Sequence, residues 1–217
     1  SIVGIELISG TDASGYDFCE LVPVELSGFV YADDNNNGNR DPGEAGIGGV
    51  ELTLLAELGR STGIKTRTDS SGYYFFDGLE PRKTYGIAEK QPEGFYDGLD
   101  SAGSAGGTAH NPGDKITGVL LPPGVNGTDY NFGELRPASI SGRVYAERNG
   151  DGIRQPDEPL LAGVTIHLLD VAGNTVATTV TDPNGEYRFT NIEPGTYGLR
   201  EIQPAGYFDG DDYVGSH

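Results

Sequence analysis

Short stretches in which apolar and polar residues alternate recur along the chain, and turn residues separate them. In the stretch 164–169, Val164, Ile166 and Leu168 share one face, as alternate side chains of a strand do. Pairs such as Asn184-Gly185 favour tight turns between the stretches, and no segment keeps a 3.6-residue period. The pattern predicts strands at 26–32, 49–56, 64–69, 72–77, 84–90, 116–121 and 128–135. It therefore predicts an all-β fold, an antiparallel sandwich.

The chain repeats itself, which is the typical signature of a tandem architecture. Three pairs of segments align: 27–55 with 141–169, 68–98 with 181–210, and 2–28 with 116–142. The first and third pairs share one offset, 114 residues, so the start of the chain copies the end of a repeat.

The repeat predicts three parts. Residues 1–24 are tail strands homologous to 115–138, residues 25–136 form a complete sandwich, and residues 138–217 form a second sandwich that lacks its last two strands. We expect residues 2–21 of one subunit to complete the second domain of the next by strand addition, which gives a head-to-tail filament. The rival interpretation is a slice of a long tandem array, in which the same strands are supplied covalently.

Composition narrows the function. The net charge of −19 argues against nucleic acid, whose phosphates need Lys and Arg, and against direct insertion into anionic membranes. With a single cysteine, Cys19, no intrachain disulfide is possible, so an extracellular domain of this kind needs another staple.

A twelve-residue loop carries oxygen ligands at the spacing of a calcium site. Positions 1, 3, 5, 7, 9 and 12 hold Asp33, Asn35, Asn37, Asn39, Asp41 and Glu44, with Gly38 at position 6. Calcium takes six to eight oxygens, so alternate side chains that converge on one centre would bind it. A polar turn that matches by chance is the alternative.

The second copy of the repeat carries the loop again. Its corresponding residues are Glu147, Asn149, Asp151, Ile153, Gln155 and Glu158. Two matches at the same place in a repeat make chance a poor explanation, although the longer Glu147 is expected to weaken or distort the site. Further acids follow a Gln-Pro-x-Gly motif: Asp97, Asp100 and Asp114 in the first copy, and Asp209 and Asp212 in the second. These form either a further metal site or a solvated loop.

Several motifs resemble those of a known family. They are S-G-F-V-Y-x-D-x-N-x-N-G-x-x-D-P-G-E (27–44), T-D-x-x-G-x-Y-x-F (68–76), Q-P-x-G-F (91–95) and Y-N-F-G-E-L (130–135). The chain resembles the SdrD B-like repeat, a relative of the Cna B-type domain. The resemblance implies prealbumin-like Greek-key sandwiches, calcium in the loops above, and a role as a rigid spacer in bacterial surface proteins and matrix fibres.

Many Cna B-type domains carry an internal Lys–Asn or Lys–Asp isopeptide bond with a glutamate beside it, and here Glu89 and Glu201 take matching positions. Residues 138–217 contain no lysine, so the second domain cannot form this cross-link, and calcium is expected to replace it as the staple.

We predict no enzyme activity. None of the histidines, His110 in a Gly-rich loop, His167 and His217, recurs in the other copy or has the spacing of a triad or a metal site. The predicted function is a calcium-stabilised structural subunit of an extracellular fibre or cell-surface stalk, with copies of itself as partners. The alternatives are a ligand-binding adhesin module and a spacer of a larger secreted enzyme.

Overall fold

The computed structural model describes residues 1–215, so the last two residues of the predicted second domain, with His217, lie outside it. The strands before residue 136 are β1 (Val24–Ala32), β2 (Glu51–Leu55), β3 (Ser61–Arg67), β4 (Tyr73–Leu79), β5 (Thr84–Glu89), β6 (Tyr96–Asp97), β7 (Thr108–His110), β8 (Lys115–Leu120) and β9 (Phe132–Leu135), with a 3-10 turn η1 (Glu57–Gly59). The later strands are β10 (Ala138–Arg143), β11 (Thr165–Leu169), β12 (Thr175–Val180), β13 (Glu186–Ile192) and β14 (Gly198–Glu201).

Contacts divide the chain into two units, residues 1–90 with 98–133, and residues 91–97 with those from 134 onwards. We call residues 24–133 the first domain and residues 138–215 the second domain.

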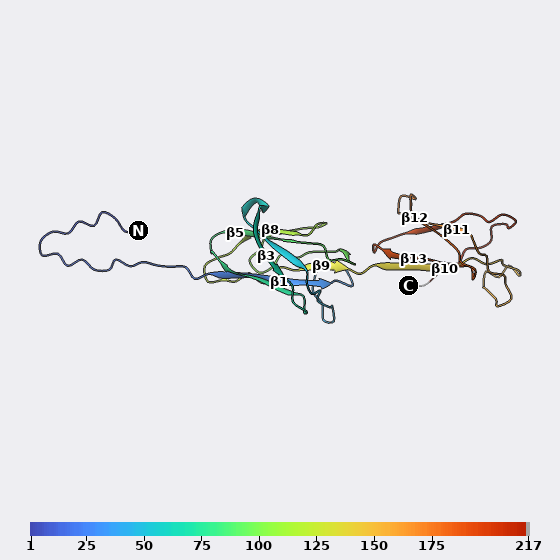
Figure 1. The fold of residues 1–217 in the computed structure, drawn as a ribbon, viewed down its shortest axis with the longest axis horizontal. Helices are drawn as coiled ribbons and strands as arrows, with labels where there is room; N and C mark the ends of the chain where they lie inside the picture. The colour runs from blue at the N-terminus through green and yellow to red at the C-terminus, as the bar shows by residue number, and fades with distance from the viewer. Residues whose placement is uncertain (216–217) are drawn as a thin grey trace. The chain divides into compact units, whose positions relative to one another are not determined.

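The first domain is built from two mainly antiparallel sheets (Figure 1), with strand orders β4-β1-β9-β6 and β3-β2-β5-β8-β7. Both sheets supply the side chains of one core, among them Leu26, Tyr74 and Phe132 from the first sheet and Leu52 and Ile87 from the second. This arrangement confirms the predicted all-β antiparallel sandwich. All seven predicted strands are present, while the short β6 and β7 were not predicted.

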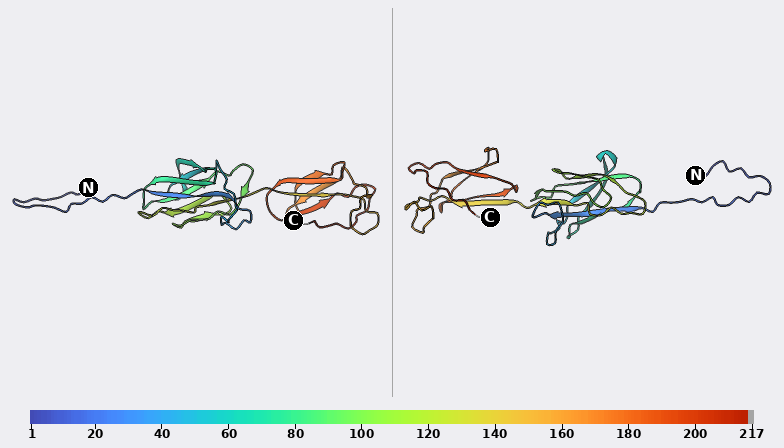
Figure 2. Two further views of the ribbon diagram at one scale, coloured as in Figure 1. Left: turned by 90° about the horizontal axis from the view of Figure 1, so that it is seen from below. Right: turned by 180° about the vertical axis from the view of Figure 1, so that it is seen from behind.

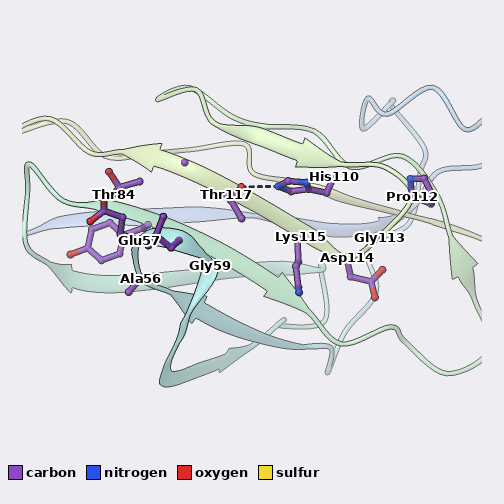
Figure 3. A pocket seen from close by; sticks show the side chains of 13 residues that line it. Ala56, Glu57, Gly59, Thr84, His110, Pro112, Gly113, Asp114, Lys115 and Thr117 are labelled. Atoms are coloured by element: carbon purple, nitrogen blue, oxygen red, sulfur yellow. Dashed lines mark hydrogen bonds between the residues drawn. The ribbon is translucent and has the colours of Figure 1, made fainter.

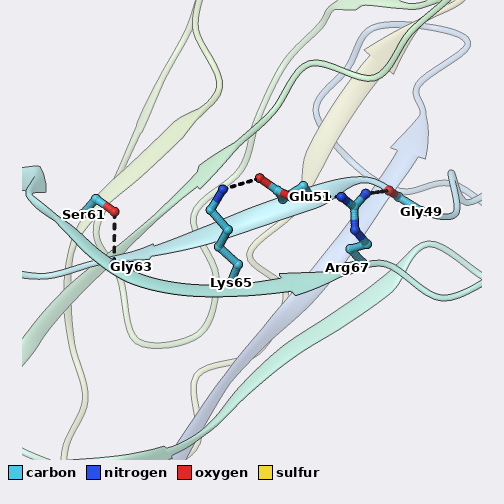
Figure 4. A network of polar contacts seen from close by, with 6 residues as sticks. All are labelled: Gly49, Glu51, Ser61, Gly63, Lys65 and Arg67. Carbon is cyan, nitrogen blue, oxygen red and sulfur yellow. Dashed lines mark hydrogen bonds and ion pairs between the residues drawn. The ribbon is translucent and has the colours of Figure 1, made fainter.

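The outer face of the five-stranded sheet is polar, as period-2 alternation requires. Glu51 on β2 accepts hydrogen bonds from Lys65 (2.6 Å) and Arg67 (3.0 Å) on β3 (Figure 4), and the Arg67 guanidinium also donates to the Gly49 carbonyl (2.8 Å). Both cations are more than half exposed, so we expect solvent to screen the pairs and their contribution to stability to be small.

The second domain repeats part of this plan. Its sheets are β10-β13 and β12-β11-β14, and they enclose a smaller core that includes the predicted inward residues Val164, Ile166 and Leu168. The irregularity at the start of β10, between Ala138 and Ile140, repeats the one between Val24 and Leu26 in β1. Within residues 138–215 no strand corresponds to β8 or β9.

Residues 1–23 contain no strand, as the three views of Figures 1 and 2 agree. Their apolar side chains are exposed: Ile2, Val3, Ile5, Leu7, Ile8, Tyr16, Phe18, Leu21 and Val22. An isolated pair of short strands is marginally stable in water, so these residues need a partner surface to form strands. No helix in residues 1–215 is long and apolar enough to span a bilayer.

Candidate calcium loops and an open sheet edge

The first residue of the predicted loop, Asp33, is fully buried at the end of β1. Its carboxylate accepts hydrogen bonds from the backbone N–H groups of Asn37 (3.1 Å) and Gly38 (2.8 Å). Gly38 has φ +73°, a conformation that glycine adopts without penalty. The loop therefore folds back over the Asp33 carboxylate through the turn at position 6.

The last residue, Glu44, closes the loop from the other side. Its two carboxylate oxygens accept hydrogen bonds from the N–H groups of Asp34 (3.0 Å) and Asp41 (2.7 Å). The side-chain amides of Asn35 and Asn37 both donate to Asp41 at 2.9 Å. These hydrogen bonds lower the pKa of the Asp41 carboxyl, because they favour its charged form.

The buried hydroxyl of Tyr31 lies beside these acids. Within residues 1–215 it has no hydrogen-bond partner. Burial raises its pKa strongly, and the charges of Asp33, Glu44, Asp100 and Asp41, in that order of effect, raise it further. Sequence reasoning missed Tyr31, whose position inside an apolar strand gives no sign of a role in the loop.

The second loop, Glu147 to Glu158, reproduces the closing contacts. The buried Glu158 accepts hydrogen bonds from the N–H groups of Arg148 (3.1 Å) and Gln155 (2.8 Å), at the loop positions that bind Glu44 in the first copy. The third acid, Asp151, accepts hydrogen bonds from the Gln155 side chain (2.8 Å) and from the Ile153 N–H (2.8 Å).

The two loops differ at position 1. One Glu147 carboxylate oxygen accepts the N–H groups of Arg148 (2.9 Å), Asn149 (3.0 Å) and Gly150 (3.2 Å), so this longer side chain folds back on the residues that follow it. Its other oxygen, Oε2, and the Gln155 Oε1 are buried and have no hydrogen-bond partner in the described part of the chain.

The chemistry of both loops fits a hard cation. In residues 1–215 no three His, Cys, Asp or Glu side chains converge closely enough to hold a metal by themselves. The loops instead combine carboxylates with side-chain amide and backbone oxygens, which is the donor mixture that calcium prefers.

The additional acids of the first copy lie in three places. Asp100 contributes to the field at Tyr31, so the structure brings it to the first loop. Asp97 belongs to β6, opposite Glu134 of β9. Asp114 lies elsewhere, directly before the first residue of β8.

Asp209 and Asp212 lie in a stretch of the second domain that contains no strand. Burial raises the pKa of Glu201 on β14, and the charges of Asp212 and Asp209 raise it further. These two acids therefore gather at β14.

A hollow of about 720 Å³ lies beside Asp114, between β5, β8 and η1 (Figure 3). His110, which was predicted to lie in a loop, is the last residue of β7, and its Nε2 lies 2.7 Å from the Thr117 hydroxyl across the β7–β8 pair. The loop prediction was wrong because the Gly-rich flanks hide a strand of only three residues.

The second domain has an open sheet edge where the first domain has a paired one. In the first domain β8 pairs with β5, and Ile87 on β5 is fully buried. The corresponding residue on β14 is Leu199, whose exposed fraction is 45%. The residues described beyond β14 do not pair with it, so its edge and the adjacent core face solvent.

A second position in the second domain also lacks the neighbouring strand that the first domain has. Gly28 of β1 lies against the backbone of Tyr130, where an added Cβ would be 1.8 Å from the carbonyl oxygen, and the Tyr74 hydroxyl donates to that oxygen (2.7 Å). At the corresponding Gly142 an added Cβ would instead meet the hydroxyl of Tyr187, 2.5 Å away. The Tyr187 side chain thus occupies space that a neighbouring strand fills in the first domain.

Comparisons with known proteins agree with the two-domain plan. The family model of the SdrD B-like domain matches residues 24–133 and 138–217. Serine-aspartate repeat-containing protein F of Staphylococcus epidermidis is 34% identical over 181 residues, which cover 83% of this chain and 11% of that protein. Serine-aspartate repeat-containing protein D of Staphylococcus aureus (strain Newman) is 33% identical over 204 residues, which cover 93% of this chain and 15% of that protein. The chain therefore spans a small part of these relatives.

Solved structures that match this chain include a streptococcal ancillary pilin (TM-score 0.41, 16% identity, 86% of this chain and 56% of that one) and the minor pilin GBS52 of Streptococcus agalactiae (TM-score 0.38, 14% identity, 87% of each chain). The sequence relatives confirm the expected location, extracellular or at the cell surface. With the family model matching both halves of the repeat, the chain belongs to the SdrD B-like domain family.

Proposed function

We propose that this chain is a calcium-stabilised structural unit of an extracellular fibre or cell-surface stalk, and that it has no enzyme activity. The observation that carries the calcium part is the buried Tyr31 hydroxyl, which lies in the field of four carboxylates from two loops. Carboxylates gathered around one buried group repel one another, and this repulsion destabilises the fold unless a cation offsets it.

Calcium would supply that cation in each of the two repeated loops, 33–44 and 147–158. In the first, Asp33, Asp41 and Glu44 are the charged donors. In the second, the oxygens of Glu147 and Gln155 that have no hydrogen-bond partner would bind the cation. Stabilisation follows because an ion that binds only the folded state adds about 2.7 kcal/mol per site at a hundred times its dissociation constant.

Calorimetric titration of calcium into chelator-treated protein tests this part. We expect saturable binding, and a weaker or absent first component in the double variant Asp33→Asn/Glu44→Gln. The double variant Asp77→Asn/Glu80→Gln, which neutralises exposed acids at the end of β4, is the matched control. Wild-type protein that takes up no calcium would refute the proposal.

The second part of the proposal concerns assembly: residues 2–21 complete a domain of the second kind. The turn geometry of this segment supports it. Gly4 and Gly10 have φ +75° and +81°, and the corresponding Gly118 and Gly124 in the first domain have φ +74° and +73°. The N–H of Thr11 donates to the Ile8 carbonyl (3.1 Å), as the N–H of Val125 donates to the Pro122 carbonyl (3.3 Å). The free segment therefore already has the backbone conformation of the glycine within β8 and of the turn that follows β8.

The apolar residues of the segment also match. Phe18 corresponds to Phe132, and their exposed fractions are 70% and 0%. The same contrast holds for the other exposed and buried pairs: Ile2 with Ile116, Ile5 with Val119, Leu7 with Leu121, Tyr16 with Tyr130, and Leu21 with Leu135. Because several of these side chains are already partly covered in the free segment, completing their burial gives roughly 4–9 kcal/mol, which lies within the range of the cost of association, about 4–15 kcal/mol.

Insertion would place the two halves of the segment at the two open edges. Residues 2–7 would pair with β14 as β8 pairs with β5, and would cover Leu199. Residues 16–21 would run beside β10, and Tyr187 would turn to donate to the Tyr16 carbonyl, as Tyr74 does to Tyr130. Residues 2–21 of a second copy, or the matching strands supplied covalently in a long tandem array, would complete the second domain equally well.

Deletion of residues 1–21 tests the assembly. We expect the full chain to form concentration-dependent oligomers in light scattering, and the deletion variant to stay monomeric with a folded first domain. The point variant Phe18→Asp should behave like the deletion, while Glu6→Asp, whose counterpart Leu120 is exposed, should not. Oligomers that survive the deletion would refute the strand addition. Protein isolated from its natural source can be denatured and its intact mass measured. A discrete mass near 23 kDa indicates a separate subunit, and a much larger mass indicates a long covalent array.

A further inference from the structure

The segment 2–21 differs from its counterpart in the first domain at two positions where that domain has glycine. Ala13 replaces Gly127, and Cys19 replaces Gly133. Both glycines are buried, so the first domain shows what surrounds a side chain placed there.

At Gly127 a methyl group would press on the ends of packed core side chains. An added Cβ would lie 2.9 Å from Cδ1 of Leu26, a fully buried core residue. The backbone cannot move away, because the Gly127 N–H donates to the Glu25 carbonyl (2.8 Å) and the Ser27 N–H donates to the Gly127 carbonyl (2.9 Å).

At Gly133 the obstacle is backbone. An added Cβ would lie 2.6 Å from the Leu99 carbonyl oxygen and 3.2 Å from Cβ of Asp33. The Gly98 N–H holds the Gly133 carbonyl at 2.9 Å, so these two chain segments cannot separate without losing that hydrogen bond. A cysteine here would have to displace the wall that supports the first residue of the calcium loop.

The second domain has different walls at both places. Leu26 is replaced by Ile140, which is only partly buried, and Leu99 is replaced by Asp211. Asp211 is exposed in a stretch without strands, so the backbone that meets Gly133 in the first domain is not held there. Asp33 is replaced by Glu147, whose side chain is folded back on its own loop.

We infer that Ala13 and Cys19 make the segment 2–21 selective: it fits an acceptor with the walls of the second domain and is barred from the place of β8 and β9 in the first domain. The inference rests on the proposed strand addition. Its consequence is that a free segment cannot displace the first domain's own strands, which is the exchange that tandem homologous domains risk.

Two reciprocal substitutions in the full chain test this selectivity. Gly127→Ala/Gly133→Cys places the residues of the segment into the first domain, and we expect its melting midpoint to fall by about 10 °C or more. Ala13→Gly/Cys19→Gly places the glycines into the segment, and we expect assembly to weaken by about tenfold, because the buried side-chain atoms are lost. All samples contain calcium and a thiol reductant.

The control is Ser9→Gly/Ser14→Gly, which adds the same backbone freedom at positions whose counterparts, Pro123 and Thr128, are exposed. It should weaken assembly less than the Ala13/Cys19 pair does. Tighter assembly of Ala13→Gly/Cys19→Gly than of wild type would overturn the inference while strand addition stands, and so would an unchanged midpoint for Gly127→Ala/Gly133→Cys. If the wild-type chain does not assemble, the strand addition and this inference both fail.

Discussion

Gly28 and Gly142 take the same place in the two copies of the repeat, yet alanine is expected to act differently at each. An alanine Cβ at residue 28 would lie 1.8 Å from the Tyr130 carbonyl oxygen, so the start of β9 must move by about 1.5 Å to reach ordinary contact. That movement breaks the hydrogen bond from the Tyr130 N–H to Ser27 (3.2 Å) and the one from Tyr74 to Tyr130 (2.7 Å).

Two lost hydrogen bonds cost about 1 kcal/mol each, and the opened core next to Tyr130 adds about 1–3 kcal/mol. We therefore expect Gly28→Ala to destabilise the first domain by about 3–5 kcal/mol. In a calorimetric scan this is a fall of about 12–20 °C in the midpoint of that domain.

At Gly142 only the Tyr187 hydroxyl is in the way, and the end of a side chain can swing aside. We expect Gly142→Ala to cost the second domain about 1 kcal/mol or less, a shift of about 5 °C. Assembly is different, because the inserted Tyr16 backbone needs the space of the new methyl group. If the clash costs the same 3 kcal/mol or more as at residue 28, the association constant falls by more than 100-fold.

Light scattering of Gly142→Ala against wild type measures this loss, with the melting of each domain as the internal control. If the Gly142→Ala variant assembles as tightly as the wild type, the strand-addition geometry is refuted. A fall in the second domain's midpoint as large as that of Gly28→Ala in the first would show that the place beside Gly142 is already filled.

Three further predictions concern charges. Asp33→Asn should lower the first domain's midpoint in calcium but not in chelator, where it relieves repulsion around Tyr31, whereas Asp77→Asn should leave the difference between the two conditions unchanged; fluorimetric melting checks both. Burial and two nearby acids raise the pKa of Glu201, so its charged form opposes folding above that pKa and the penalty fades as pH falls through it. In chelator Glu201→Gln should therefore raise the second domain's midpoint at pH 7 and have no effect near pH 4, and an equal gain at both values would contradict the assigned cause. Glu51→Gln, which removes the exposed ion pairs with Lys65 and Arg67, should shift the midpoint by less than about 3 °C, and a larger fall would show that the outer-face pairs matter more than their exposure implies.

The sequence predicts the strands of the first domain well because their alternation reflects burial on one face. It misses β7 because three residues between glycines have no measurable period, and their strand state comes from pairing with β8. The repeat locates both loops, and the structure brings Asp100 to the first of them. Tyr31 could not be found from the sequence, since its importance depends on which loops lie beside its hydroxyl. The open edge at β14 was predicted from the alignment, but the different walls around Gly127 and Gly133 depend on packing distances that no pattern encodes.

Calcium-dependent stability is the central claim, and paired melting curves in calcium and in excess EDTA test it most directly. With each loop saturated at about a hundred times its dissociation constant, the account predicts that both domains melt at least about 10 °C higher in calcium than in EDTA. Midpoints that are the same in the two solutions would contradict it.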